Sequence, residues 1–230
     1  MPFAYCRRLL VIAGVFLWSG LAPAAPIPLQ TPATQGAQVQ QRKTSKPYTG
    51  DLSIFEYADR DKKLHVDHVM DILGISAGKS VADIGAGSGW FTVRAARRVT
   101  PAGFVYAVDI SPEAIRYIQD RVIREDIGNV RTVVSKPDDP GLPEASVDAV
   151  LLLKTYHEVA DPVALMRNLR RALRPHARVG IIDRNGNGEN HGVDRKVVLQ
   201  ETGQAGYRLV GEYDFVKSDG EDYFLVFEAR

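Results

Sequence analysis

The fold is decided by residues 81–89, Val-Ala-Asp-Ile-Gly-Ala-Gly-Ser-Gly. In this stretch an apolar run ends in an acidic residue and opens into glycines at alternating positions. Such glycines let the chain turn sharply from a strand into a helix, and they leave backbone N–H groups open to a ligand because no Cβ stands in the way. The stretch therefore predicts a strand, a turn that binds a nucleotide-like ligand, and a following helix.

The spacing of the glycines distinguishes between two kinds of nucleotide-binding turn. The dinucleotide fingerprint is Gly-x-Gly-x-x-Gly, whereas this chain has Asp-x-Gly-x-Gly-x-Gly, with Trp90 where the last glycine of the fingerprint would stand. This spacing disfavours a nicotinamide-dependent oxidoreductase. A second apolar run, residues 104–108, ends in Asp109, and a carboxylate at a strand tip can accept hydrogen bonds from both ribose hydroxyls. Two strand ends are thus expected to face one ligand.

Taken together, these motifs resemble those of the class I S-adenosylmethionine-dependent methyltransferases, and more narrowly of their ubiquinone/menaquinone-type branch. Further matches occur in the family's order over roughly residues 64–183. They are Tyr106-Ala107-Val108-Asp109-Ile110-Ser111, then Leu142-Pro143 before Ser146-Val147-Asp148, then residues 169–175 before the run 179–183. The resemblance implies S-adenosylmethionine as the cofactor and methyl transfer as the activity.

Apolar strands and amphipathic helices alternate along the folded part of the chain. Helices are expected at 64–73, 90–99, from Ser111 toward Gly128, 161–173 and 193–205, and strands at 81–84, 104–108, 130–134, 147–153, 179–183, 207–216 and 223–228. Strands that are apolar on both faces favour a parallel sheet covered on both sides, which is an α/β, doubly wound fold. The resemblance adds a seven-stranded, mostly parallel sheet, with a C-terminal hairpin whose last strand lies antiparallel beside the fifth.

The first fifty residues have the composition of a targeting segment followed by a linker. Arg7-Arg8, an apolar stretch of about ten residues and small residues before Ala25 are typical of a secretory signal, and the stretch is too short to span a bilayer as a helix. An uncleaved anchor is the alternative. We expect a signal peptide in 1–24, a flexible linker in 25–50 and a methyltransferase domain in 51–230, and hence a protein that is periplasmic or secreted.

Composition restricts the chemistry and the partners of the protein. Cys6, the only cysteine, lies in the expected signal, so a mature chain has neither a disulfide nor a thiolate nucleophile. The 29 Lys and Arg nearly balance the 28 Asp and Glu, and no long basic run is present. Nucleic acid is therefore not expected as a substrate, because neutralising phosphates requires clustered positive charge. Membrane contact is expected only through the signal, and the sequence leaves the oligomeric state open.

On the cofactor side, the resemblance implies roles for the residues of the glycine turn and of three strand ends. The turn passes the methionine and ribose portions, Asp83 orients the turn or the amino group, Asp109 binds the ribose, and Ile110 packs on the adenine. After the third strand, Lys136 stands where the family has an acid, so the adenine contact shifts to Asp138 or to backbone groups. The predicted cofactor-binding residues are Asp83, Gly85, Ala86, Gly87, Gly89, Asp109, Ile110, Asp138 and Lys154. The alternatives are a plain turn and solvated surface charges.

On the acceptor side, Tyr156 and His157 follow the fourth strand and are the predicted catalytic residues. His157 could remove a proton from the acceptor, because the pKa of an unperturbed histidine lies near neutrality. The alternative is a histidine that bridges local backbone groups. His191, in the loop after the fifth strand, could line the same pocket, and its polarity would equally suit a loop.

Two groups of residues near the first expected helix are weaker candidates. His65 and His68 are three residues apart on that helix with no third ligand in evidence, so no metal site is expected. Tyr57 and Arg60, which precede the helix, could close over the cofactor.

The predicted function is methyl transfer to a small-molecule or lipid-like acceptor. The sequence lacks the Asn/Asp-Pro-Pro-aromatic motif of nucleobase methylases, which again disfavours nucleic acid. The alternative is a noncatalytic exported module that keeps the fold to bind a ligand or a partner, since S-adenosylmethionine is made in the cytosol.

Overall fold

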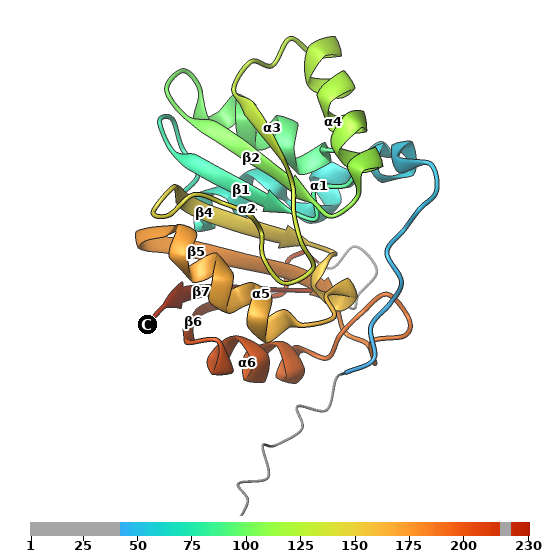
Figure 1. Cartoon of the computed structure of the whole chain (residues 1–230), viewed down its shortest axis with the longest axis vertical. Coiled ribbons are helices and arrows are strands. Elements are labelled where there is room, and N and C mark those ends of the chain that lie inside the picture. Colours follow the sequence, from blue (N-terminus) through green and yellow to red (C-terminus); the bar gives the residue numbers. More distant parts are fainter. Residues whose placement is uncertain (1–41, 217–221) are drawn as a thin grey trace, which may run out of the picture. The chain divides into compact units, whose positions relative to one another are not determined.

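The computed structural model describes residues 42–216 and 222–230, and the predicted signal peptide lies outside these ranges. The described chain forms one seven-stranded sheet with helices on both faces (Figure 1). The strands are β1 (Ser80–Ile84), β2 (Phe104–Asp109), β3 (Val130–Val134), β4 (Val147–Leu153), β5 (Leu173–Arg184), β6 (Tyr207–Tyr213) and β7 (Asp222–Ala229). The helices are α1 (Arg60–Leu64), α2 (Val66–Ile72), α3 (Trp90–Val99), α4 (Pro112–Arg124), α5 (Pro162–Leu169) and α6 (Arg195–Gln204), with 3-10 turns η1 (Leu52–Glu56), η2 (Tyr156–Glu158) and η3 (Arg170–Ala172).

The strand order confirms the predicted doubly wound fold. The order is β3-β2-β1-β4-β5-β7-β6, and the first five strands of the chain are paired in parallel. β7 lies antiparallel between β5 and β6, as the resemblance implied. The order reverses direction between β1 and β4, and ligands of open α/β sheets bind beyond the carboxyl ends of the strands at such a point.

Alternate residues of the central strands explain the two helical layers. Val81 and Val105 pack with apolar residues of α2 and α3, whereas Ala82 and Tyr106 pack on the other face with α5 and α6. Helix α4 packs through Ile118 on the first of these faces. All residues of β1 are buried, as expected for a strand covered on both sides. Among the described helices, none is both long and apolar enough to cross a membrane.

Side-chain caps set the starts of two of the predicted helices. The Ser111 hydroxyl accepts the N–H of Ala114 at 3.2 Å, and Asp161 caps α5 in the same way, each followed by proline at the first helical position. The ends are less well predicted. Helix α4 ends at Arg124 and not at Gly128, because Asp126 adopts a left-handed conformation with φ of 53° that breaks the helix.

Residues 42–50, which fall in the predicted linker, pack against the domain. Ser45 is buried, and its N–H donates to the carbonyl of His157 at 3.2 Å. The Arg42 guanidinium donates to the carbonyl of Tyr156 at 2.6 Å and to Glu201 at 2.9 Å. The packed part of the chain therefore includes Arg42, and the expected domain boundary at residue 51 is too late. Composition missed this packing because backbone groups and two polar side chains make the contacts.

Candidate active site

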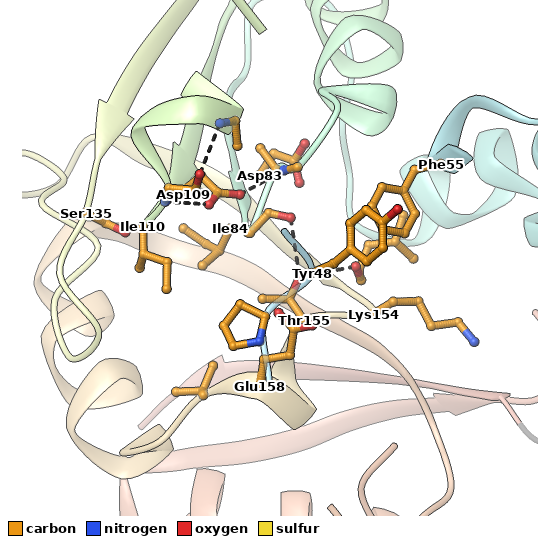
Figure 2. Close-up of a pocket in the computed structure, with 18 of the residues that line it drawn as sticks. Tyr48, Phe55, Asp83, Ile84, Asp109, Ile110, Ser135, Lys154, Thr155 and Glu158 are labelled. Carbon is orange, nitrogen blue, oxygen red and sulfur yellow. Dashed lines mark hydrogen bonds between the residues drawn. The ribbon is translucent and has the colours of Figure 1, made fainter. Parts of the chain in front are cut away.

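One cavity of about 450 Å³ lies at the carboxyl ends of β1, β2 and β4 (Figure 2). Its volume falls in the range typical of small-molecule sites. The walls come from the glycine turn, the ends of these strands, the loop after β3, the turn after β4 and the N-terminal segment. The lining residues used below are Pro47, Tyr48, Leu52, Phe55, Arg60, Asp83, Gly85, Ala86, Gly87, Trp90, Asp109, Ile110, Ser135, Lys154, Thr155 and Glu158.

The glycine turn has the conformation that the alternating glycines predict. Gly85, Gly87 and Gly89 have φ values of 73°, 53° and 71°, a region that residues with a Cβ rarely adopt. A Cβ on Gly85 would lie 2.2 Å from Cγ2 of Thr155, so the turn and the end of β4 leave no room for a side chain at this position. Gly87 faces open space in the cavity wall, and Gly89 is buried against Ile118 as α3 begins.

Asp109 and Ile110 lie side by side at the end of β2, on the wall of the cavity (Figure 2). The two carboxylate oxygens of Asp109 accept the backbone N–H groups of Gly87 and Ser111, each at 2.9 Å. These bonds fix the carboxylate against the glycine turn, and each oxygen keeps a lone pair for a further donor such as a hydroxyl. The side chain of Ile110 is 46% exposed, so an apolar surface faces the cavity beside the carboxylate.

Asp83 is buried beneath the turn, and its carboxylate accepts the Thr92 hydroxyl at 2.6 Å. Burial, together with the charge of Asp109, raises the pKa of Asp83 to about 7, although the Thr92 hydrogen bond and the charge of Arg60 oppose the shift. The Arg60 guanidinium lies 4.3 Å from the ring centre of Trp90 and lines the cavity. Tyr57 does not line it, so of Tyr57 and Arg60 only Arg60, the first residue of α1, is at the site.

Of the predicted cofactor-binding residues, Asp138 lies outside the cavity wall, and Lys154 lies on the wall with its ammonium engaged elsewhere. Asp138 is exposed and outside the cavity wall, which after β3 is formed by Ser135, Lys136 and Pro137. Lys154 reaches the wall, but its ammonium pairs with the buried carboxylate of Asp222 and points away from the cavity centre (Figure 2). Both residues follow strand ends, which is why the sequence pointed to them. Asp138 is carried away from the wall by the long loop between β3 and β4, and the Lys154 ammonium is held by its ion pair with Asp222.

The predicted catalytic residues Tyr156 and His157 are both buried and lie outside the cavity wall. Turn η2 directs the Tyr156 ring into the core, where burial raises the pKa of its hydroxyl well above the usual value. His157 Nδ1 lies 2.8 Å from Oδ1 of the buried Asp183, and the His157 N–H donates to the same carboxylate at 3.0 Å. Neither side chain lines the cavity, and a role of these two residues at the acceptor stays a prediction.

The polar groups that face the cavity after β4 are those of Thr155 and Glu158 (Figure 2). Burial, with the charges of Asp109 and Asp183, raises the pKa of Glu158 to about 7, although the nearby His157 opposes the shift. The sequence analysis predicted that this segment lies near the acceptor and named Tyr156 and His157, whereas Thr155 and Glu158 are the residues that line the cavity. A 3-10 turn places residues three apart on one face, so Thr155 and Glu158 point together while the two residues between them turn inward.

Aromatic side chains of residues 42–50 and of η1 form a further part of the cavity wall. The rings of Tyr48 and Phe55 pack edge to face with centres 5.2 Å apart, and Pro47 and Leu52 extend the apolar surface. Sequence reasoning missed these residues because Pro47 and Tyr48 lie in the predicted linker, and no motif marks Leu52 and Phe55. The feature of the sequence that could have indicated them is the pair of aromatic residues, Tyr48 and Phe55, shortly before the first predicted helix.

The histidine pair near the start of the domain has a structural explanation. His65 and His68 lie at the start of and within α2, and the rings of both contact Phe215, with centres 5.7 and 4.7 Å away. Both imidazoles are exposed, and within the described ranges no third ligand joins them.

The strand order and the glycine turn, with a carboxylate at the next strand end, define a Rossmann-like fold of the class I methyltransferase type. Solved structures show the same fold. A SAM-dependent methyltransferase from Aquifex aeolicus is 23% identical, with a TM-score of 0.70 over 78% of this chain and 98% of that one. Aeropyrum pernix fibrillarin, solved with bound S-adenosylmethionine, has 18% identity and a TM-score of 0.55 over 72% of this chain and 74% of that one.

Residues 81–176 match the family model described as "Methyltransferase domain". The "Ubiquinone/menaquinone biosynthesis C-methyltransferase UbiE" of Hahella chejuensis is 29% identical over 50% of this chain and 46% of its own length. The nocamycin O-methyltransferase of Saccharothrix syringae is 28% identical over 49% of this chain and 40% of its own length. The match thus spans about half the length of these curated relatives. Residues 81–176 thus resemble methyltransferase domains, and the described chain has the fold of the class I S-adenosylmethionine-dependent methyltransferases.

Proposed function

We propose that the protein transfers the methyl group of S-adenosylmethionine to a small-molecule or lipid-like acceptor. The observation that carries the proposal is the wall of the cavity, where the glycine turn, the Asp109 carboxylate and the exposed side of Ile110 lie together. A nucleoside needs these three elements: a close backbone for the sulfonium and ribose region, an acceptor for the ribose hydroxyls and an apolar surface for the base.

The acceptor half of the cavity favours an apolar molecule. Tyr48, Phe55 and Leu52 present aromatic and aliphatic surface, while Thr155 and Glu158 supply polar groups near the end of β4. The relatives named above act, by their names, on quinone precursors and on an antibiotic, and both are small molecules. These observations support a small or lipid-like acceptor and leave open which atom is methylated.

The chemistry requires little beyond alignment, because the sulfonium of S-adenosylmethionine is an activated donor. Attack by the acceptor, transfer of the methyl group and departure of the thioether occur in line. Holding the two reactants in this geometry can lower the barrier by about 7–11 kcal/mol at best. In this protein, the turn and Asp109 would fix the donor, and the N-terminal aromatic wall would hold the acceptor and exclude water.

The fold alone does not decide the activity, as one of the solved structures illustrates. The [4+2]-cyclase SpnF shares the fold with a TM-score of 0.62 and 15% identity over 82% of this chain and 86% of that one. We therefore propose two separate measurements on the full chain. Calorimetric titration with S-adenosylmethionine and, in parallel, with NAD tests the ligand. Release of S-adenosylhomocysteine in the presence of extracted metabolites and lipids tests the reaction, and binding without release would favour the noncatalytic module.

Replacement of Gly87 by aspartate links binding to the turn. The new side chain would enter the cavity beside Asp109, and its charge and bulk should abolish S-adenosylmethionine binding. Gly74→Asp is the matched control, because Gly74 also has a positive φ, 72°, and open space around it but lies outside the cavity wall. Equal affinity in both variants would remove the turn from the proposed site.

We also propose that the protein works outside the cytosol. The proposal is supported by the basic, apolar and small-residue pattern of the first 24 residues. Export would require a supply of cofactor, so S-adenosylmethionine bound to protein purified from the exported fraction is the result to seek. Protein found in the cytosol with its first 24 residues intact would contradict the proposal.

A further inference from the structure

Two histidines and one carboxylate meet at the edge of the cavity. One ligand atom of each of His157, Glu158 and His191 lies within 4.8 Å of the other two, and no other such group occurs within residues 42–216 and 222–230. Nε2 of His157 is 3.8 Å from Oε1 of Glu158, and the two imidazole rings are nearly perpendicular with centres 5.7 Å apart. The proposed function uses neither histidine.

The imidazole of His157 is held in the tautomer that a metal ligand needs. Its Nδ1 lies 2.8 Å from Oδ1 of Asp183, a buried carboxylate that also accepts the backbone N–H groups of His157 and Arg184. A carboxylate in this position keeps the proton on Nδ1, so Nε2 presents a lone pair toward Glu158. Metal-ligating histidines in proteins commonly carry such a carboxylate on the opposite nitrogen.

His191 is brought to the cluster by a specific backbone arrangement. It has a φ of 56°, and its N–H donates to the hydroxyl of Ser45 at 2.9 Å. The same hydroxyl donates to the carbonyl of Gly188 at 2.9 Å, and the Ser45 N–H donates to the carbonyl of His157 at 3.2 Å. One buried serine thus ties the segments of both histidines together, although 34 positions separate them in the sequence.

The local charge favours a cation. Within the described part of the chain, neither Glu158 nor Asp183 has a Lys or Arg within ion-pair distance, and each contacts His157. Asp183 is fully buried and the side chain of Glu158 is 22% exposed, so the two carboxylates gain little from solvent. A divalent ion would balance both charges where no basic side chain does so.

We propose that Nε2 of His157, the carboxylate of Glu158 and the imidazole of His191 bind one divalent transition-metal ion. Two imidazoles and one carboxylate with a fourth position left for another ligand form a donor set of catalytic zinc sites, whereas magnesium and calcium prefer oxygen donors. Tetrahedral zinc places its ligand atoms about 3.4 Å apart. The ligand atoms of the cluster lie within 4.8 Å of one another, and rotation of the Glu158 side chain and of the exposed His191 side chain would bring them to the shorter zinc spacing.

The place of the ion suggests its use, and this step rests on the proposed function. Glu158 lines the cavity (Figure 2), and under the proposed function the ion would lie near the acceptor. A zinc ion there would bind an oxygen or nitrogen of the acceptor and orient it toward the donor. The acceptor class narrows accordingly to molecules with a metal-binding hydroxyl, carbonyl or amine.

Zinc binding by the full chain tests the site without reference to catalysis. Protein purified with a tag free of histidine is treated with a chelator, dialysed and titrated with Zn²⁺ against a chromophoric competitor, in the absence of S-adenosylmethionine. We expect one ion per chain. His191→Asn, which tolerates the left-handed backbone, and Glu158→Gln should each weaken binding at least tenfold. His68→Ala removes another exposed imidazole and should change nothing.

Two results would overturn the inference: no stoichiometric binding by the wild-type chain, or equal affinity in wild type and His191→Asn. Replacement of zinc by Co²⁺ gives a second readout, since the visible spectrum reports tetrahedral nitrogen and oxygen ligation and should be lost in both cluster variants. Failures of the two proposals are distinguishable. Zinc binding without S-adenosylhomocysteine release leaves the metal site standing, and S-adenosylmethionine binding without zinc leaves the cofactor site standing.

Discussion

The buried carboxyl group of Asp83 predicts a loss of folding stability as the pH rises. Its pKa is about 7 in the folded protein, against an ordinary value of 3.8. The folded state therefore binds a proton that the unfolded state releases, and stability falls as the pH increases from about 4 to about 7. Each unit of pKa difference corresponds to 1.36 kcal/mol, so the roughly three units cost about 4 kcal/mol of unfolding free energy above pH 7.

Replacement of Asp83 by asparagine removes this cost. The amide side chain would keep a carbonyl oxygen for the Thr92 hydroxyl and would stay neutral at every pH. We expect Asp83→Asn to match the wild type near pH 4 and to exceed its unfolding free energy by up to about 4 kcal/mol at pH 8. Urea unfolding at half-unit steps from pH 4 to pH 8 measures the difference.

Asp148→Asn provides a control of opposite sign. Although partial burial opposes it, the N–H of Ser80 and the charges of Arg174 and Lys79 lower the pKa of Asp148 below its ordinary value. That carboxylate stabilises the fold above its unfolded pKa of 3.8, and the contribution is lost as the pH falls through the folded pKa. The control variant should be less stable than the wild type at pH 8. If the difference in unfolding free energy between the wild type and Asp83→Asn stays constant from pH 4 to pH 8, the assigned role of the Asp83 proton is refuted.

Two further predictions concern the turn and Tyr156. Gly85→Ala should lower the unfolding free energy, measured in urea, by about 2 kcal/mol more than Gly74→Ala does. Both positions have a positive φ, but only at Gly85 would the new Cβ clash with Thr155. Equal losses of unfolding free energy in the two variants would contradict this close contact. Tyr156→Phe should leave S-adenosylmethionine affinity unchanged, because the tyrosine is buried and does not line the cavity; a lost affinity would place Tyr156 at the site.

The geometry of the proposed cofactor half of the cavity was predictable because local sequence encodes it. Glycines at alternating positions require a turn with positive φ, and the acid that ends the next apolar run must lie at the neighbouring strand end. Asp109 accepts a hydrogen bond from Gly87 as a direct consequence of this register. The same reasoning failed after β3, where a loop without a helix carries Asp138 away from the wall.

The residues after β4 show where local reasoning stops. A run of polar residues, 154–158, follows the strand, and the sequence indicates that they lie near the acceptor, but it does not indicate their orientation. Lys154 adopts a φ of 56°, and the 3-10 turn that follows then decides which side chains face outward. The orientation of His157 is fixed by Asp183, which accepts both the ring N–H and the backbone N–H of the histidine. Asp183 is 26 residues away in the sequence, so local patterns do not reveal this contact.

Specificity in this protein is therefore expected to reside in contacts between segments that are distant in sequence. Backbone groups, the Asp109 carboxylate and the neighbouring Ile110 form the proposed cofactor half, which explains why short local motifs predict it. Side chains from the N-terminal segment, η1 and the turn after β4 form the acceptor half, and Ser45 joins the first of these to the loop that carries His191. A relative can keep the glycine turn and change its acceptor by altering any of these segments, so the acceptor half is where substitutions should separate the substrates of otherwise similar chains.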